Sequence, residues 1–178
     1  MRKLKNEELN RLTPEQFREA EKLPVIVVLD NVRSLHNVGS VFRTCDAFRI
    51  AELYLCGITG KPPDREIHKT ALGATETVKW RYFPQTKDAI KELKEKQVAI
   101  YAIEQAENSI SLSEFSLPKN ETIAIVFGNE VKGVEQEVVN ECNNVIEIPQ
   151  TGSKHSLNIA VSVGVVCWEL FSGTIKKK

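Results

Sequence analysis

The stretch Val25-Ile26-Val27-Val28-Leu29 is a short, uninterrupted apolar run. Such a run predicts a strand that is buried on both faces, because a strand with one face in water alternates apolar and polar residues. Runs of the same kind recur at residues 52–56, 98–103, 123–127 and 145–148. The sequence therefore predicts a sheet that is covered on both sides.

Segments of helical character alternate with these runs, at residues 38–48, 87–95, 134–141 and 157–171. Buried strands that alternate with helices predict an α/β fold, with a parallel sheet flanked by helices. In that architecture a ligand binds beyond the carboxyl ends of the strands. The strand ends are therefore the places to search for function.

The chain has 178 residues, of which 42% are hydrophobic, and this is enough for one sizeable core. Residues 1–23 are expected to form a helical extension that packs on the domain or on a partner subunit. Within it, Thr13-Pro14-Glu15-Gln16 supplies an N-cap, a proline at the first helical position and a capping-box glutamine. The domain is expected at residues 24–172, and a basic tail at residues 173–178.

The four cysteines are widely spaced without a Cys-x-x-Cys pair, and the three histidines form no ligand cluster with them. We therefore expect reduced thiols in a cytoplasmic protein that has no metal site. The N-terminus has no apolar signal core. The longest apolar stretch, residues 157–171, contains Asn158 and Glu169 and is shorter than a membrane span of about 20 residues. No membrane association is expected.

The formal net charge is zero, but the charges are unevenly distributed. Residues 100–150 hold nine acidic and two basic side chains, so the remainder carries a basic surplus. Part of this surplus is clustered in six residues: Lys61, Arg65, His68, Lys69, Lys79 and Arg81. A basic face of this kind can bind phosphates in a protein that is neutral overall. Charge alone, however, favours an ordinary solvated surface.

The first polar strand end leads from Asp30 into the helical segment that contains Asn37 and Arg43. Asn37 can cap this helix, and Arg43 then lies six residues further on, on a different side of it. An arginine among apolar neighbours either extends its head to water or binds an anion. Taken alone, this segment favours the structural interpretation.

The second strand end is the loop that follows residues 123–127, with glycines at positions 128 and 133. Glycines at these points suit sharp turns or a close approach to a ligand. The spacing matches neither the dinucleotide fingerprint nor a phosphate-binding loop. Glu130 could therefore be a capping carboxylate for the helix that begins at Val134, or a functional group.

The third strand end is the stretch Ile-Pro-Gln-Thr-Gly-Ser-Lys-His-Ser-Leu-Asn at residues 148–158. Ser156 is expected to be the N-cap of the following apolar helix. Asn158 would then lie inside that helix, where an amide side chain needs a partner. Small polar side chains and free amides at such a strand-to-helix turn are typical of a small-molecule site.

The three segments resemble, in the same order, the motifs of the SpoU/TrmH family of SPOUT RNA methyltransferases. The patterns are Asn-x-Gly-x-x-x-Arg at 37–43, Phe-Gly-x-Glu-x-x-Gly at 127–133 and Ile-Pro-x-x-Gly-x-x-x-Ser-Leu-Asn at 148–158. The resemblance extends over residues 25–170. Gln150 stands where the family often has methionine, and Arg49 where glycine is common.

This resemblance implies a C-terminal deep trefoil knot and a homodimer. Residues 157–171 agree with a dimer, because this segment is apolar nearly all round. The implied reaction is methyl transfer from S-adenosylmethionine to a ribose 2′-hydroxyl of tRNA or rRNA, with tRNA slightly favoured. The implied cofactor-binding residues are Gly128, Ile148 and Leu157.

The implied catalytic residues are Asn37, Arg43, Glu130, Ser156 and Asn158. Arg43 suits the clamping of an RNA phosphate and the stabilisation of a developing alkoxide better than the removal of a proton, because a guanidinium stays protonated. Asn37 is expected to orient Arg43 or the nucleotide, and Glu130 to organise the loop. Ser156 and Asn158 are expected to hold the loop and the target nucleotide.

Two other functions stay open: a SPOUT enzyme that methylates a base, and an RNA-binding protein that has lost turnover. Trp80 and Tyr82 could stack on RNA bases. Since aromatic and basic residues alternate at residues 79–82, we favour an amphipathic strand there.

Overall fold

A computed structural model describes residues 1–175, so the lysines at positions 176–178 of the predicted basic tail lie outside the described residues. The described chain forms one seven-stranded sheet in the order β3-β2-β1-β6-β4-β7-β5, and every adjacent pair is parallel. The strands are β1 Leu23–Asp30, β2 Ile50–Cys56, β3 Trp80–Phe83, β4 Ala99–Ile103, β5 Ile110–Ser111, β6 Ile123–Phe127 and β7 Asn144–Glu147. The predicted parallel α/β sheet is confirmed.

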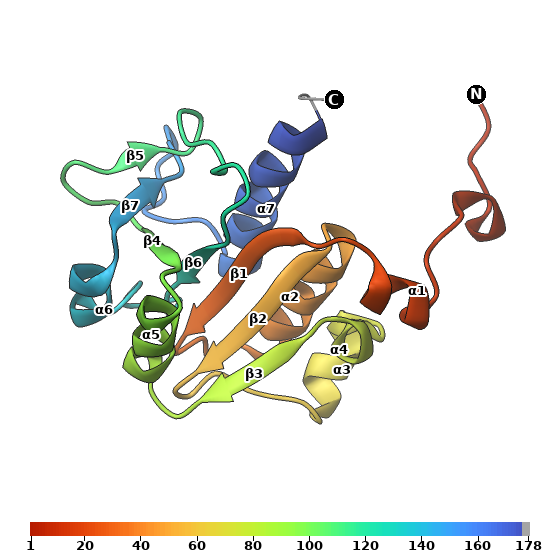
Figure 1. Ribbon diagram of the computed structural model, residues 1–178, viewed down its shortest axis with the longest axis horizontal. Helices are drawn as coiled ribbons and strands as arrows, with labels where there is room; N and C mark the ends of the chain where they lie inside the picture. Colours follow the sequence, from red (N-terminus) through yellow and green to blue (C-terminus); the bar gives the residue numbers. More distant parts are fainter. Residues whose placement is uncertain (176–178) are drawn as a thin grey trace.

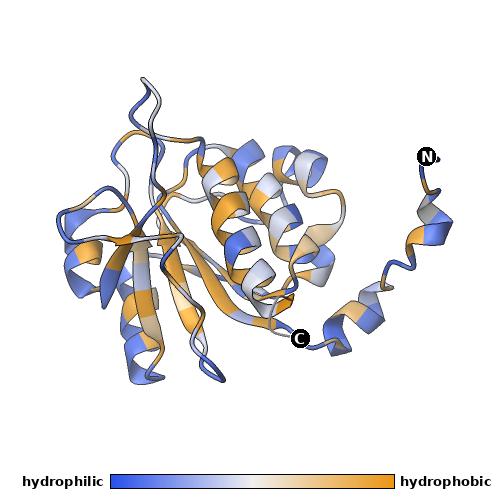
Figure 2. Cartoon of the chain, turned by 90° about the horizontal axis from the view of Figure 1, so that it is seen from above, coloured by the Kyte–Doolittle hydropathy of each residue, from blue (hydrophilic) through white to orange (hydrophobic). Residues whose placement is uncertain are grey.

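Helices cover both faces of this sheet (Figure 1). They are α1 Pro14–Glu19, α2 Leu35–Ala47, α3 Arg65–Ala71, α4 Ala74–Thr77, α5 Thr86–Glu95, α6 Gln136–Glu141 and α7 Ile159–Ile175. Helices α2, α3, α4 and α7 contribute to the core on one face, and α5 and α6 to the core on the other. Figure 2 shows that the strands in the middle of the sheet are mostly apolar, whereas the helices carry both apolar and polar residues.

Strand β1 shows why consecutive apolar residues are required. Val25, Val27 and Leu29 point into the core on the α2 and α7 side, whereas Ile26 and Val28 point into the core on the α5 and α6 side. Both sets are buried, because side chains alternate along a strand and both faces are covered.

The N-terminal residues do not form the continuous helix that we predicted. A 3-10 turn at Asn6–Leu9 and the short helix α1 are separated by residues without helical structure. The predicted start of α1 is confirmed, because Thr13 Oγ1 accepts from the Gln16 amide and Gln16 Oε1 accepts from the Thr13 amide. Phe17 anchors α1 on the domain, while the preceding residues extend away from it (Figure 1).

Two predicted helix caps are wrong. Helix α2 begins at Leu35 and is capped by Ser34, whose hydroxyl accepts from the Asn37 amide, so Asn37 lies in the first turn. Helix α7 begins at Ile159, and its cap is Asn158, whose Oδ1 accepts from the Ala160 amide at 2.9 Å. Asn158 therefore has the local partner that we expected it to lack, and Ser156 lies in the preceding loop.

The thiols behave as the sequence predicted. Cys45, Cys56 and Cys167 are buried, and within residues 1–175 all the cysteines are free. Burial raises the pKa of Cys56 and of Cys167 to about 12, so both remain protonated. None of the described helices is both long enough and apolar enough to span a bilayer.

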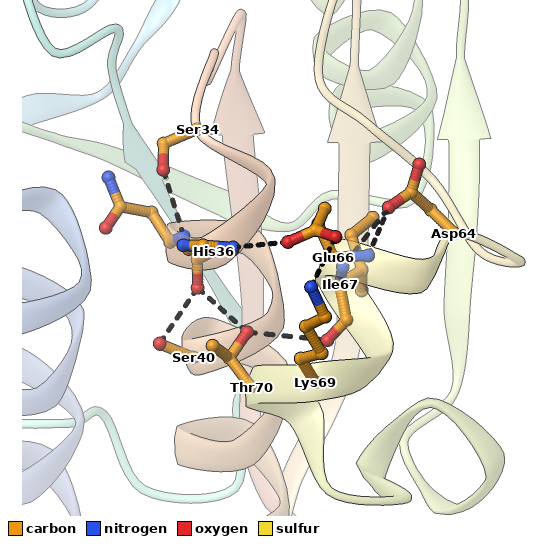
Figure 3. Close-up of polar contacts among 9 residues, drawn as sticks. Ser34, His36, Ser40, Asp64, Glu66, Ile67, Lys69 and Thr70 are labelled. Atoms are coloured by element: carbon orange, nitrogen blue, oxygen red, sulfur yellow. Dashed lines mark hydrogen bonds and ion pairs between the residues drawn. The ribbon is translucent and has the colours of Figure 1, made fainter.

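Helices α2 and α3 approach each other closely, and polar contacts join them (Figure 3). His36 Nε2 lies 2.8 Å from Glu66, which also accepts from Lys69, and the Thr70 hydroxyl donates to the His36 carbonyl. The approach requires Gly39: a Cβ there would lie 2.1 Å from Thr70 Oγ1 and 2.3 Å from the Ile67 carbonyl oxygen.

Gly39→Ala should therefore destabilise the protein by about 1–3 kcal/mol, since the carbonyl belongs to the backbone of α3 and cannot rotate away. Urea denaturation measures the free energy of unfolding. Gly173→Ala is the control, because nothing lies within 4 Å of its Cβ position in α7, and it should stabilise by about 0.5–1 kcal/mol. Equal effects of both substitutions would contradict the close approach.

Candidate active site

The three sequence motifs meet at one edge of the sheet. Each follows the carboxyl end of a strand: β1, β6 or β7. Because all the strands are parallel, these ends lie at the same edge, and Leu29 of β1 is level with Phe127 of β6. The loops that follow are therefore brought together, as the sequence analysis expected.

Glu130 joins the first two motifs. Its Oε2 accepts from the Arg33 amide at 3.0 Å, and its Oε1 accepts from the Ser34 amide at 3.1 Å and from Asn37 Nδ2 at 3.1 Å. Burial alone would raise the pKa of Glu130, but these hydrogen bonds outweigh it, and the pKa lies below its usual range. Glu130 is thus an ionised carboxylate with donors on both oxygens.

Asn37 extends the connection to the third motif. Its Oδ1 accepts from Asn158 Nδ2 at 3.3 Å, while its own Nδ2 is bound to Glu130. Asn158 in turn caps α7 through its Oδ1. A continuous chain of hydrogen bonds therefore links the three loops through Glu130, Asn37 and Asn158.

A cavity of about 480 Å³ lies between the second and third loops. Gly128, Ile148 and Leu157 all line it, and so do three predicted catalytic residues: Glu130, Ser156 and Asn158. Six of the eight predicted residues thus line one cavity. Asn37 does not line it but is hydrogen-bonded to Glu130 and Asn158 at its rim, and Arg43 lies elsewhere.

Gly128 allows the loop after β6 to fold back on itself. A Cβ at this position would lie 2.0 Å from the backbone of Gly133 and of Val134. Asn129 and Gly133 exchange backbone hydrogen bonds of 2.8 and 2.9 Å, and Gly133 has a φ of 71°. The glycines at both ends of this turn therefore shape one wall of the cavity.

Arg43 lies apart from the cavity of its own chain. It is exposed on α2, where it borders a separate hollow with Phe48, Lys69 and Thr70, and its side chain has no hydrogen bond or ion pair among residues 1–175. Helix α2 is regular, so Arg43 and Asn37 point to different sides of it. The prediction that Asn37 orients Arg43 is therefore wrong within one subunit.

Sequence reasoning missed three residues that support the cavity. Glu104 Oε1 accepts from the Val134 amide at 2.7 Å, Gln105 Nε2 donates to the His155 carbonyl at 2.7 Å, and Asn129 Nδ2 donates to the Asn31 carbonyl at 2.8 Å. Glu104 and Gln105 directly follow β4, and their place at a strand end is the signal that could have identified them.

A larger hollow, of about 750 Å³, lies between α5 and α6. Lysines of α5 and glutamates of α6 border it, but none of the eight predicted site residues does. Size alone does not identify a site, and the six predicted site residues that line the smaller cavity favour it. In the described part of the chain, no group of three or more His, Cys, Asp or Glu side chains could hold a metal ion.

Comparison with known proteins gives a family match over most of the chain. The sequence model described as the SpoU rRNA Methylase family matches residues 24–168. A tRNA (guanosine(18)-2'-O)-methyltransferase of Thermus thermophilus is 32% identical over 143 residues, which make up 80% of this chain and 72% of that enzyme.

Relatives that act on ribosomal RNA are similarly close. The 23S rRNA (guanosine-2'-O-)-methyltransferase RlmB of Neisseria meningitidis is 30% identical over 146 residues, 82% of this chain and 57% of that enzyme. A crystal structure of an AdoMet-bound rRNA methyltransferase of Sinorhizobium meliloti matches with a TM-score of 0.77 and 27% identity, over 89% of this chain and 60% of that one.

The hydrogen bonds of Glu130 predict a stability difference that depends on pH. At neutral pH, Glu130→Gln should lower the free energy of unfolding by about 1–3 kcal/mol, because it replaces a charged acceptor of three bonds. A carboxylate whose folded pKa is lowered stabilises the fold above its unfolded pKa, and this stabilisation is lost as the pH falls through the folded value.

The difference between wild type and Glu130→Gln should therefore be full at pH 7 and shrink below pH about 4.3. Urea denaturation between pH 3 and pH 7 measures it. Glu107→Gln is the matched control and should have little effect, because Glu107 is exposed and its side chain makes no hydrogen bond or ion pair within the described residues. A difference for Glu130→Gln that is constant over this range would contradict the assignment.

Proposed function

The chain belongs to the SpoU rRNA methylase family, and on this basis we propose that it transfers a methyl group from S-adenosylmethionine to a ribose 2′-hydroxyl of RNA. The observation that carries the proposal is that the three motif loops meet at one edge of the sheet, where two of them line one cavity and the first is hydrogen-bonded to its rim. Relatives named as tRNA and as 23S rRNA 2'-O-methyltransferases support the reaction class.

The cavity suits S-adenosylmethionine in size and lining. Its volume of about 480 Å³ lies within the usual range for small-molecule sites. Ile103, Phe127, Ile148 and Leu157 provide apolar walls for an adenine, and the turn at Gly128 brings backbone groups to the rim. When bound, the cofactor supplies an activated methyl group on a cationic sulfur, so the protein has mainly to position the reactants.

The polar residues then act mostly by positioning. Glu130 is a poor acceptor for the hydroxyl proton, because its pKa is lowered and both oxygens are occupied. We assign it to fixing the loop after β1 against the cavity. Asn37 and Asn158 continue that connection, and Ser156, at the cavity mouth, is placed to contact the target nucleotide.

We propose that the active unit is a homodimer. Along α7 the apolar residues Val161, Val165 and Trp168 are exposed on one side, with Trp168 54% exposed. The aromatic rings of Phe48 and Phe171 extend this surface, since both pack against Trp168. A contiguous exposed apolar surface of this kind is typical of a protein–protein interface.

A dimer also gives Arg43 a place in the reaction. Arg43 lies on α2 near Phe48, at the Trp168 end of the stripe, whereas the cavity lies at the Leu157 end. In a two-fold pairing of antiparallel stripes, the Trp168 end of one subunit meets the Leu157 end of its partner. Arg43 then reaches the partner's cavity, where it binds an RNA phosphate and stabilises the developing alkoxide.

We infer further that residues 24–172 are the SPOUT domain, preceded by a helical extension and followed by a basic tail, and that its C-terminal segment forms a trefoil knot. The contact of Gln105 with the His155 carbonyl supports the knot, since it fastens the loop before α7 to the end of β4. A cytoplasmic location remains a prediction. Of the two RNA classes, tRNA is slightly favoured.

Transfer of labelled methyl groups from S-adenosylmethionine to total tRNA and to rRNA tests the reaction. We expect label in a 2′-O-methyl nucleoside, and Arg43→Ala should lower kcat by a factor on the order of 10²–10³, since it removes a charge that stabilises the transition state. Arg18→Ala, on α1, is the control and should act like wild type. Label in a methylated base would favour the base-methylating alternative, and RNA binding without transfer the non-catalytic one.

The dimer is tested with Trp168→Glu. A buried charge in an apolar interface is costly, so this variant should sediment as a monomer and lose methyl transfer while it keeps its fold by circular dichroism. Leu72→Glu changes an apolar residue outside α7 that is 65% exposed, and this variant should remain dimeric. If Trp168→Glu sediments like wild type, the proposed interface is incorrect.

A further inference from the structure

The two halves of the sheet differ in charge, and this difference restricts how RNA can approach the cavity. Residues 100–150, which form β4, β5, β6, α6 and β7, carry nine acidic and two basic side chains. Phosphates are repelled by this half. The remaining approach along the same edge passes over the carboxyl ends of β1, β2 and β3.

The loops after β1 and β2 carry Arg33 and Lys61, and Tyr82 is the last residue but one of β3. Asp30 of β1 is level with Cys56 of β2, and Cys56 is level with Phe83 of β3, so the three ends form a continuous border. Arg33 lies beside the cavity, because its backbone amide is bound to Glu130. Lys61 and Tyr82 lie further along the border, at the end of the edge strand.

Lys61 and Tyr82 form a defined pair. The Lys61 ammonium lies 3.9 Å from the centroid of the Tyr82 ring, and the Tyr82 hydroxyl donates to the Gly57 carbonyl at 3.0 Å, which fixes the ring at the surface. Tyr82 is 36% exposed. The ring is thus held in place from within the protein, while the cation lies over it from the solvent.

The basic residues of this border have no carboxylate partners. In residues 1–175, neither Arg33 nor Lys61 forms an ion pair, whereas their basic neighbours do: Lys69 with Glu66, Lys79 with Glu52 and Arg81 with Glu92. Arg33 and Lys61 are therefore cations at the strand ends that remain available to phosphate. Trp80, two residues before Tyr82 on β3, packs edge-on against Phe42.

We propose that unpaired RNA next to the methylated nucleotide lies along the ends of β1, β2 and β3, with one base stacked on Tyr82 and with Arg33 and Lys61 on its phosphates. This rests on the proposed function. Stacking of a base on an aromatic ring is stronger than an exposed cation–π contact, so the base displaces the Lys61 ammonium. The released ammonium then binds phosphate.

The test compares Tyr82→Ala, Tyr82→Phe and Lys61→Ala with wild type, and uses Lys119→Ala, an exposed lysine of the acidic half, as a matched control. Filter binding to tRNA and to rRNA at several salt concentrations gives Kd and its salt slope, methyl transfer gives kcat and KM, and calorimetry gives the affinity for S-adenosylmethionine. Tyr82→Ala should raise the Kd for RNA at least fivefold, and Tyr82→Phe less than twofold, since it keeps the ring.

Lys61→Ala should lower the salt slope by about 1, and Lys119→Ala should leave it unchanged. Cofactor affinity should be unaltered in all four variants, which confirms that the cavity is intact. If Tyr82→Ala disturbs the loop and weakens cofactor binding, the salt slope of Lys61→Ala tests the proposal instead. Lys61→Ala keeps the hydrogen bond between the Tyr82 hydroxyl and the Gly57 carbonyl, so the loop stays in place.

Wild-type RNA affinity in Tyr82→Ala together with a wild-type salt slope in Lys61→Ala would overturn the proposal. RNA binding by wild type without methyl transfer would refute the proposed function. The Kd values of the variants relative to wild type would still test the proposed RNA-binding surface in that case. If wild type binds neither RNA, both proposals fail.

Discussion

The arrangement of the site depends on the carboxylate of Glu130. From the loop after β6 it binds two backbone amides and one side-chain amide at the start of α2, and Asn37 carries the connection on to Asn158 at the start of α7. Each of these loops is short of regular backbone partners at a strand end. Glu130 supplies partners to the amides of the loop after β1, and the Asn37–Asn158 contact links this loop to the third segment.

Much of the fold could be predicted because burial on both faces of a sheet leaves a local trace, as in the apolar run at residues 25–29. The gathering of Gly128, Ile148 and Leu157 was predictable from the resemblance of their motifs. The start of α7 was not, because Ser156 and Asn158 are both good caps two residues apart. Glu104 was missed for a different reason: its partner, the amide of Val134, lies 30 residues away.

The position of Arg43 could not be predicted, because its motif fixes spacing along a helix but not the subunit that it serves. The regular turn of α2 directs Arg43 away from the cavity of its own chain and toward the apolar surface that Phe48 shares with Trp168. A site assembled between two subunits would account for both features. In such a site, the apolar face of α7 that forms the dimer also brings Arg43 to the cavity of the partner subunit, so catalysis depends on dimer formation.

A crystal structure of the protein with S-adenosylhomocysteine would test the central assignment most directly. We expect the ligand in the cavity between the loops after β6 and β7, with its adenine against Ile148 and Leu157 and with backbone contacts at Gly128. Density for the ligand in the larger hollow between α5 and α6, with this cavity empty, would contradict the account.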